Sequence, residues 1–338
     1  MTWEGLWYHR RARWLSLLLL PVSWVYAWGA RLNRARHRPQ RVEGLTVISV
    51  GNIVAGGAGK TPFVIWLAQW ARSAGKRVAV LSRGHGRRST DILHLSGTSP
   101  VTSVEAGDEP ALMHRRLPEV EVWVGSDRLE LARLAKKHGA DVAILDDGFQ
   151  HHRLARDLDI VIVGDLGNQR ALPAGPLREP LSVLQHAQVI IGRGGSAEGT
   201  PHTSHARHAA FQWELTAFVD EVGRTHPLHE LQGVPLVALS GIARPAEFER
   251  QLTLAGAQVK AHAIFGDHHH FTDAELRTVR ALAASHRARI ITTEKDRERL
   301  GNRLDVLTTR YEVRPLSGLE HLAETLGWPV ALVAGGKG

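Results

Sequence analysis

The feature that most constrains the fold is a glycine-rich stretch between an apolar run and a helical pattern. Residues 45–50 form a mostly apolar run typical of a buried strand. The stretch at 51–62 ends in Gly-Lys-Thr-Pro, and apolar residues then recur at helical spacing over 63–71. A strand, a glycine-rich loop and a helix in this order predict a phosphate-binding loop, because backbone N–H groups at a helix N-terminus attract anions.

Within this loop, Lys60 is expected to reach the β- and γ-phosphates of a nucleotide, and Thr61 to offer a hydroxyl to Mg²⁺. The usual motif has glycine at the position of Val54, so Gly56 and Gly57 are left to supply the turn. The alternative is a glycine-rich turn with a surface lysine. The residues predicted to hold the nucleotide are Val54, Ala55, Gly56, Gly57, Ala58, Gly59, Lys60 and Thr61.

The composition is that of a folded protein with an anionic partner. A chain of 338 residues is long enough for two domains. It has no cysteine, which excludes disulfides, thiolate metal sites and cysteine nucleophiles. The net charge of +8 favours a phosphorylated substrate, an anionic membrane or nucleic acid as partner.

Much of the positive charge flanks an apolar run at residues 14–30, which also carries tryptophans near its ends. Its length is at the lower limit for spanning a bilayer. Because basic residues flank both ends, the charge distribution does not predict how the segment would be oriented across a membrane. Aromatic residues and arginines around a short apolar helix are typical of a segment lying on an anionic membrane surface. A helix in a soluble core and a signal peptide are the alternatives.

Polar residues follow several later strands. An apolar strand at 141–145 ends in Asp146 and Asp147, a pattern typical of a Mg²⁺ site beside a phosphate loop. Glu179, in a loop rich in proline and glycine, is a third candidate for the metal. An arginine-rich loop at 82–88 is predicted to face phosphate, with an ordinary solvated loop as the alternative.

The strand and helix pattern predicts an α/β fold with two sheet domains. The expected parts are a membrane-associating helix (1–40), a P-loop NTPase-like domain with a parallel sheet (41–205), a β linker (206–232) and a smaller α/β domain (233–330). Asp108 and His268 are candidates for orienting or deprotonating an acceptor hydroxyl, although spacing alone does not bring them together. Three metal ligands from His268, His269 and His270 are disfavoured, because adjacent side chains do not share a face.

In order along the chain, these motifs resemble the tetraacyldisaccharide 4′-kinases of lipid A biosynthesis. The matching stretches are 49–62, 82–84, 107–110, 146–151, 172–179, 240–243, 267–268 and 292–296. The resemblance covers most of the chain, and the family's own loop lacks the glycine that Val54 replaces. His85 departs from the family, which usually has Tyr after Ser-Arg-Gly.

The resemblance implies an ATP- and Mg²⁺-dependent kinase that phosphorylates the 4′-hydroxyl of an acylated glucosamine disaccharide 1-phosphate. It implies that Asp108 and His268 act as a pair on that hydroxyl, and that Asp146, Asp147 and Glu179 place Mg²⁺ or ATP. We assign substrate binding to Arg83, Arg128, Arg178, Gln150 and His151. A monomer at the cytoplasmic face of the bacterial inner membrane is expected, without nucleic acid.

A different function class stays open from the residues alone. A GTPase or metallochaperone-type NTPase that switches partners would also use Gly-Lys-Thr and histidines. Against it, the sequence has no Asn-Lys-x-Asp motif for guanine and no cysteine for metal transfer.

Overall fold

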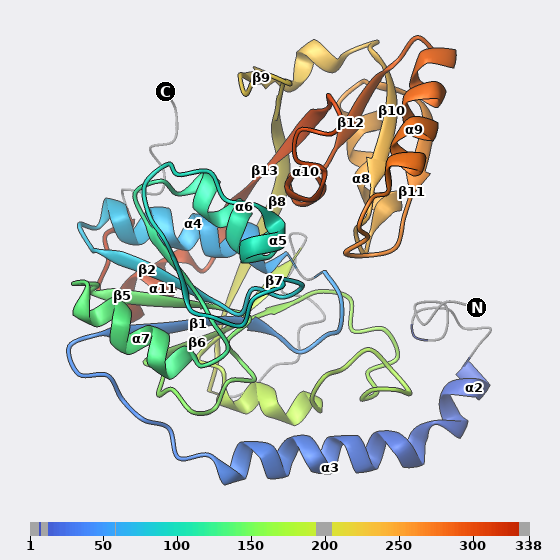
Figure 1. Cartoon of the computed structure of the whole chain (residues 1–338). Helices are drawn as coiled ribbons and strands as arrows, with labels where there is room; N and C mark the ends of the chain where they lie inside the picture. Colours follow the sequence, from blue (N-terminus) through green and yellow to red (C-terminus); the bar gives the residue numbers. More distant parts are fainter. Residues whose placement is uncertain (1–6, 8–12, 58, 194–204, 331–338) are drawn as a thin grey trace. The chain divides into compact units, whose positions relative to one another are not determined.

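The computed structural model describes residues 7, 13–57, 59–193 and 205–330. Contacts divide the chain into two compact units (Figure 1). The first unit comprises Met1–Arg83, Gly125–Gln212 and Arg314–Gly338, and the second comprises Gly84–Val124 and Trp213–Val313. The segment 84–124 therefore groups with the C-terminal half of the chain, whereas the sequence predicted that it belongs to the kinase domain.

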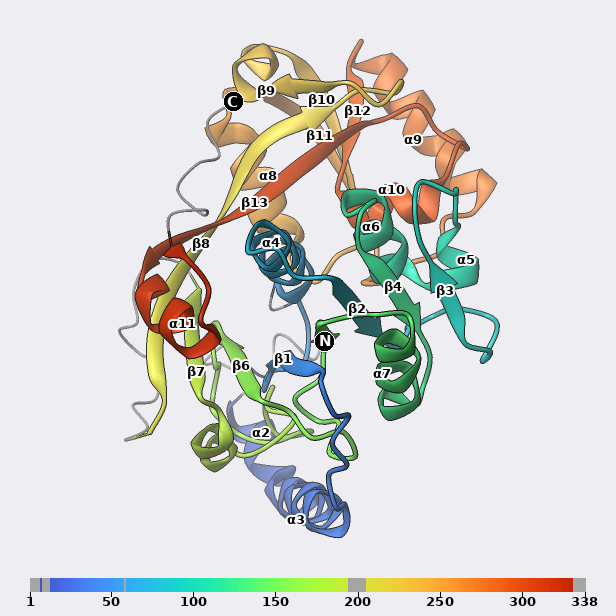
Figure 2. The same ribbon diagram turned by 90° about the vertical axis from the view of Figure 1, so that its left-hand side faces the viewer.

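The first unit is built on a parallel sheet, as the strand and helix pattern predicted. Its strands, in spatial order, are β8 (Arg207–Val219), β7 (Val189–Arg193), β6 (Leu158–Val163), β1 (Thr46–Asn52), β5 (Val142–Asp146) and β2 (Val78–Ser82). Figure 2 shows β1, β6 and β7 side by side. Val50 of β1 pairs with Asp146 of β5, so the phosphate loop and the first aspartate leave neighbouring strands at the same edge.

Two helices cover strands of this sheet. Both α4 (Lys60–Ser73) and α7 (Arg128–Lys137) pack against β2 and β5. Phe63, Val64 and Leu67 of α4 are buried, at the helical spacing that the sequence predicted. The remaining elements of the unit are η2 (Leu181–His186) and α11 (Leu319–Leu326).

The apolar N-terminal run forms two helices, α2 (Arg13–Leu18) and α3 (Leu20–Arg36). The break precedes Pro21, which has no N–H to continue the hydrogen bonding of α2. The second helix extends six residues past the predicted end of the run, into the arginines at 31–36. The apolar stretch is therefore divided between α2 and α3, and its last part lies in a helix that continues beyond it.

The second unit has a further group of parallel strands. Strand β10 (Pro235–Ser240) pairs with β11 (Gln258–Ile264) and β12 (Arg289–Thr292), and β12 pairs with β13 (Leu307–Ser317). Leu236 and Ala238 pack with α8 (Pro245–Leu254), while Val237 and Leu239 pack with α9 (Asp273–Ser285). Because alternate side chains of a strand point to opposite faces, α8 and α9 cover opposite faces of this sheet.

Shorter elements complete the second unit. Strand β3 (Leu93–Leu95) is antiparallel to β4 (Glu121–Val124), and β9 (Thr225–Pro227) is antiparallel to β8. The helices are α5 (Ser103–Ala106), α6 (Asp108–Arg116), η3 (Leu228–Leu231) and α10 (Glu294–Leu300). Helix α10 packs on α6, and two ion pairs join them: Arg116–Glu294 at 2.7 Å and Lys295–Glu109 at 2.5 Å.

Candidate active site

The phosphate loop begins as a buried extension of β1. Val54 is 6% exposed and packs with Ile53, Phe149 and Leu177. It forms an antiparallel bridge with Leu177, and the N–H of Ala55 donates to the carbonyl oxygen of Pro176 at 2.7 Å. The position where the usual motif has glycine is thus filled by an apolar core residue.

The glycines come after this bridge. Gly56 has φ of 101° and Gly59 has φ of 78°, backbone conformations that residues with a Cβ rarely adopt. Gly59 precedes the first residue of α4, Lys60. A loop with this backbone at a helix N-terminus fits a phosphate group. Ala58, also assigned to the nucleotide, lies outside the described residues.

Lys60 is held by neighbouring oxygen atoms. Its Nζ donates to Oδ1 of Asn52 at 3.2 Å and lies 3.3 Å from Oδ1 of Asp147. Arg178 donates to Oδ2 of the same aspartate at 2.9 Å. Asp147 has φ of 54°, a left-handed conformation that is costly for a residue other than glycine and is common at functional sites. The structure thus brings three predicted residues together at the end of β5.

The other metal candidates have different surroundings. Asp146 is 2% exposed and accepts a hydrogen bond from Oγ of Ser82 at 3.2 Å, and Thr61 is also 2% exposed. Hydroxyl and carboxylate oxygens of this kind are the ligands that Mg²⁺ prefers, so Thr61, Asp146 and Asp147 fit that ion. Glu179 instead accepts hydrogen bonds from Arg34, at 3.2 and 3.3 Å, and from Gln150.

Some of the residues assigned to the substrate are exposed, and others are buried or hydrogen-bonded within the protein. Arg83 is exposed. Arg128 is 6% exposed, its Nη1 donates to the carbonyl oxygen of Ser126, and burial lowers its pKa, with the charge of Arg83 adding to the effect. Gln150 donates both to Glu179 and to the carbonyl oxygen of Asn52. Burial lowers the pKa of His151 to about 4, and the Arg128 charge adds to this shift.

Asp108 and His268 meet in the second unit. Nδ1 of His268 lies 3.1 Å from Oδ2 of Asp108, although 160 positions separate them. The Asp108 side chain is 9% exposed and that of His268 is 37% exposed, so the imidazole is the accessible member. The ring of His85 contacts that of His268 edge-on, with centroids 5.5 Å apart. The residue that replaces the family's usual Tyr therefore touches this pair.

Two glycines allow a close backbone crossing next to Asp108. Gly107 has φ of 91°, and a Cβ there would lie 2.9 Å from the carbonyl oxygen of His85. A Cβ on Gly84 would lie 2.6 Å from the carbonyl oxygen of Ala106. The backbones of the Ser-Arg-Gly and Gly-Asp-Glu-Pro motifs therefore cross so closely that glycine is required on both sides.

The sequence did not assign a role to the residues behind the pair. Nε of Arg299 lies 3.0 Å from Oδ2 of Asp108, and Nη2 lies 3.2 Å from Oδ1 of Asp296. The only available signal was the Thr-Glu-Lys-Asp motif at 293–296, which belongs to α10. Asn52 and Arg34, which hold Lys60 and Glu179, were also not assigned to the site.

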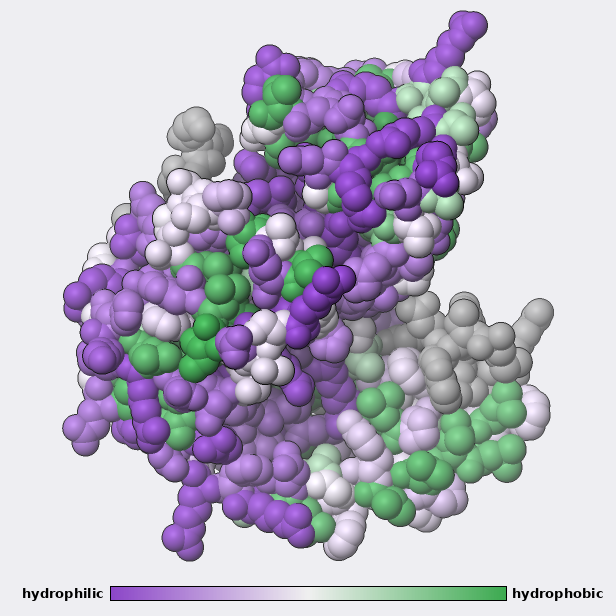
Figure 3. Space-filling model, in the orientation of Figure 1, coloured by the Kyte–Doolittle hydropathy of each residue, from purple (hydrophilic) through white to green (hydrophobic). Residues whose placement is uncertain are grey.

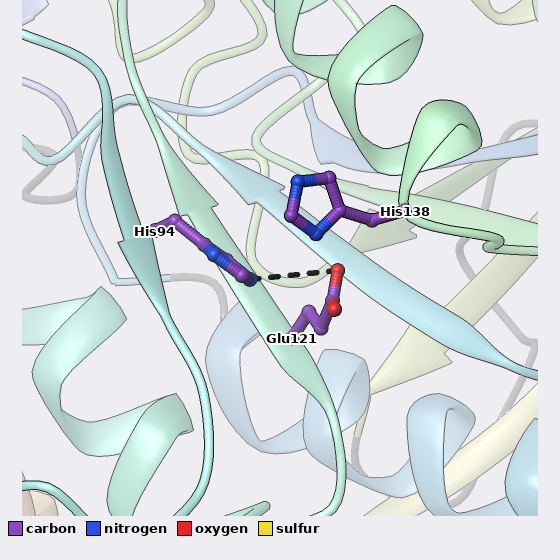
Figure 4. A group of neighbouring side chains, drawn as sticks. All are labelled: His94, Glu121 and His138. Atoms are coloured by element: carbon purple, nitrogen blue, oxygen red, sulfur yellow. Dashed lines mark ion pairs between the residues drawn. The ribbon is translucent and has the colours of Figure 1, made fainter.

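The neighbouring histidines have separate partners. Nε2 of His269 lies 3.0 Å from Oε2 of Glu275, and its ring stacks on Phe265 with centroids 4.9 Å apart. Since His268 faces Asp108, the imidazole rings of His268 and His269 do not point to a common metal position. Elsewhere in the second unit, His94 lies 3.5 Å from Glu121 (Figure 4). The ring of His94 also stacks on that of Trp123.

An apolar surface covers α2 and α3. Trp14, Leu18, Trp24, Val25 and Trp28 are each at least 62% exposed. Apolar side chains gather along this part of the molecule in Figure 3. Two serines of these helices are buried instead: Oγ of Ser16 and Oγ of Ser23 donate to carbonyl oxygens of the loop at 171–174. None of the described helices is both long enough and apolar enough to cross a membrane.

Comparisons with known proteins show extensive similarity to one family. Residues 15–326 match the model of the tetraacyldisaccharide-1-P 4′-kinase family. A tetraacyldisaccharide 4′-kinase of Anaeromyxobacter sp. (strain Fw109-5) is 38% identical, over 95% of this chain and 94% of its own length. One from Parvibaculum lavamentivorans is 36% identical over 89% of each chain.

A solved structure has the same fold. It is the "apo" form of LpxK from Aquifex aeolicus in complex with ATP, with a TM-score of 0.77 and 30% identity. The match covers 94% of this chain and 99% of that one. The α/β fold expected from the sequence is confirmed, and the chain belongs to the tetraacyldisaccharide-1-P 4′-kinase family.

Proposed function

We propose that this chain transfers the γ-phosphoryl group of ATP to the 4′-hydroxyl of a tetraacyl glucosamine disaccharide 1-phosphate, forming the bis-phosphorylated lipid A precursor, lipid IVA. The observation that carries the proposal is the Asp108–His268 contact in a chain that also has the phosphate loop. Family membership favours this kinase over the alternative of a GTPase-type switch.

The first unit supplies the nucleotide site. The loop at 54–61 binds the phosphates through backbone N–H groups, and Lys60 exchanges its contact with Asp147 for phosphate oxygens. Thr61, Asp146 and Asp147 would hold Mg²⁺, which would supply positive charge to neutralise the phosphates. Glu179, already paired with Arg34, acts by holding Gln150 and α3 in place.

The second unit supplies the group that acts on the acceptor. Asp108 accepts from Nδ1 of His268, which fixes the imidazole tautomer and leaves Nε2 to take the hydroxyl proton. The exposed position of the imidazole suits contact with a substrate. His85 packs on the ring edge and limits its rotation.

Basic residues suit the anionic parts of the substrate. Arg83, which is exposed, and Arg178, which is partly exposed, are available to phosphate oxygens. Arg128 and Gln150 donate hydrogen bonds within the protein and His151 is partly buried, so we propose that they support the site from behind.

A lipid substrate requires that the enzyme reach a membrane surface. The exposed tryptophans of α2 and α3, together with Arg31 and Arg38 nearby in the sequence, match an anionic lipid interface. We place the protein as a peripheral monomer on the cytoplasmic face of the bacterial inner membrane, where ATP is available. The buried Ser16 and Ser23 set which side of the helices faces the protein.

The test is incubation of the purified protein with γ-labelled ATP, Mg²⁺ and the tetraacyl disaccharide 1-phosphate in mixed micelles. Label is expected in the lipid with the unaltered protein, and is expected to fall about a hundredfold with Lys60→Ala. Lys76→Ala, which changes an exposed lysine away from the loop, is the matched control. Absence of labelled lipid, when the protein binds ATP, would refute the proposal.

A further inference from the structure

The Thr-Glu-Lys-Asp motif at 293–296 and the following turn of α10 have no part in the roles described above. Side chains from this segment nevertheless contact α6, the helix that begins at Asp108. Glu294 pairs with Arg116, and Lys295 pairs with Glu109. Arg299, the last charged residue of α10, forms an ion pair with Asp108 itself.

Arg299 is almost completely enclosed, with a side chain that is 1% exposed. Its Nη1 and Nη2 each donate to the carbonyl oxygen of Gly241 at 3.0 Å, and Nη1 also donates to that of His269 at 3.3 Å. Nε lies 3.0 Å from Oδ2 of Asp108 as an ion pair, although its N–H is not directed along a hydrogen bond. A planar guanidinium with this many contacts has one available orientation.

The same contacts reach the histidine. The carbonyl oxygen of Gly241 also accepts from the N–H of His268 at 3.2 Å, so Arg299 and the His268 backbone share an acceptor. The bond to the carbonyl oxygen of His269 holds the next residue. One guanidinium thus contacts the side chain of Asp108, the carbonyl oxygen that accepts from the N–H of His268, and the carbonyl oxygen of the next residue.

Asp296 fixes this arrangement from the opposite side. Its carboxylate is fully buried; Oδ1 accepts from the N–H of Gly241 at 3.1 Å and pairs with Arg299 at 3.2 Å. Oδ2 accepts from Oγ1 of Thr293 at 2.7 Å. A Cβ on Gly241 would lie 3.2 Å from both Arg299 and Asp296, so these groups pack around a glycine.

We propose that Arg299 is a positioning residue for the phosphoryl transfer, and that Asp296 and Gly241 hold it. It sets Oδ2 of Asp108 and the backbone at 268–269 in one geometry, so that the imidazole meets the acceptor hydroxyl in a productive orientation. This inference rests on the proposed function, because it assigns Arg299 to the Asp108–His268 pair. The role differs from that of Arg116, which joins the same two helices without touching Asp108.

The test is a pair of kinetic comparisons in the full-length protein. Arg299→Ala is expected to lower kcat about 10- to 100-fold, with the KM for ATP changed less than about twofold. Arg116→Gln, the matched control, is expected to lower stability with kcat nearly unchanged. In an Asp108→Asn background, Arg299→Ala is expected to cost less than about twofold, because residues that act as a unit are not additive.

Further readouts separate positioning from stability. Millimolar guanidinium, below denaturing concentrations, is expected to restore part of the activity of Arg299→Ala. Should Arg299→Ala not fold, Arg299→Lys keeps the charge but loses the planar fork, and the same comparison is made with it. Equal losses of kcat in both backgrounds, or equal losses for the Arg299 and Arg116 variants, would overturn the proposal.

An NMR measurement on the His268 imidazole tests the positioning role without measuring turnover. The ¹⁵N NMR signal of His268 Nδ1 is expected to shift in Arg299→Ala and to stay in place in Arg116→Gln. If the unaltered protein transfers no phosphate, the proposed function fails while this comparison still stands. If it transfers phosphate and the signal is unmoved by Arg299→Ala, the positioning role alone fails.

Discussion

The backbone at His268 is in the left-handed region, with φ of 58°. Such a conformation costs about 1–3 kcal/mol for a residue other than glycine and persists only when neighbouring contacts hold it. Here the N–H of His268 is bonded to the carbonyl oxygen of Gly241 and to Oδ1 of Asp267. The sequence named His268 and Asp108 as separate candidates and paired them only through the family resemblance, because residues this far apart carry no periodic signal of contact.

Loss of either member of the pair is expected to affect turnover and spare the nucleotide. Asp108→Ala and His268→Ala should each lower kcat about 10²- to 10⁴-fold, the range for a missing proton acceptor. ATP affinity, measured by calorimetry or fluorescence, should stay nearly unchanged, since the phosphate loop belongs to other residues. Loss of ATP binding in both variants would show that these residues have a different role.

A second residue-scale prediction concerns acid stability. Burial lowers the pKa of His151 to about 4 and that of His152 to about 3, with nearby arginines adding to both shifts. In the unfolded chain both titrate near about 6.5, so between those values the unfolded state binds more protons. The free energy of unfolding should therefore fall as pH drops from about 6.5 toward about 4, and these groups contribute no pH dependence above about 7.

The measurement is thermal unfolding across this pH range. The double variant His151→Gln, His152→Asn should show a smaller decrease in Tm on acidification than the unaltered protein. His286→Asn, at an exposed position, is the control and should leave the slope unchanged. An unchanged slope in the double variant would contradict the pKa shifts.

At the scale of elements, periodicity predicted the buried strands and amphipathic helices well. The strands predicted at 45–50 and 141–145 are β1 and β5, whose bounds differ from prediction by one or two residues. Strand β13 was not predicted, because 307–317 mixes charged residues with apolar ones and only four of its 11 residues are buried. Strand β3 is too short, at three residues, to show alternation.

The crossing of Gly84 and Gly107 gives a prediction at this scale. Gly107→Ala forces a Cβ against the carbonyl oxygen of His85 and displaces the start of α6, so both stability and kcat should fall. We expect a loss of about 1–3 kcal/mol in the free energy of unfolding. Gly97→Ala also has positive φ, at 70°, but nothing lies within 4 Å of its Cβ, and it serves as the control.

The comparison separates two costs. Gly97→Ala measures the effect of φ alone, and the excess cost of Gly107→Ala measures the close approach of the backbones. Chemical denaturation and steady-state kinetics give the two quantities. Equal effects of both substitutions on kcat would mean that the crossing does not position Asp108.

At the scale of the whole molecule, the sequence predicted two α/β regions but not their composition. Residues 84–124 lie between β2 and α7 in the chain, yet group with 213–313. Hydrophobic periodicity identifies which residues are buried, not which core they join. The grouping of 84–124 with 213–313 therefore has no local signal in the sequence. The predicted boundaries at 205, 206 and 232 stay predictions.

Membrane association is a property of the whole molecule that α2 and α3 are expected to supply. The triple variant Trp14→Ser, Trp24→Ser, Trp28→Ser should bind anionic vesicles at least about tenfold more weakly, because each indole contributes apolar area to the interface. These side chains are at least 62% exposed, so folding should be unaffected. Val222→Ser with Leu254→Ser, which removes exposed apolar residues of the second unit, is the control.

Vesicle sedimentation across lipid compositions checks this expectation. Binding should also weaken as ionic strength rises, because arginines contribute electrostatic attraction to an anionic surface. Unchanged sedimentation of the tryptophan variant would exclude α2 and α3 as the membrane-binding surface.

The most direct test of the kinase assignment is the position of the phosphate in the reaction product. The purified protein, ATP, Mg²⁺ and the tetraacyl disaccharide 1-phosphate are incubated, and the lipid product is examined by ¹H–³¹P correlation NMR. The proposed function predicts a new phosphate correlated with the proton at the 4′ carbon, absent when Asp108→Ala replaces the unaltered protein. A phosphate at any other hydroxyl, or inorganic phosphate with unmodified lipid, would contradict it.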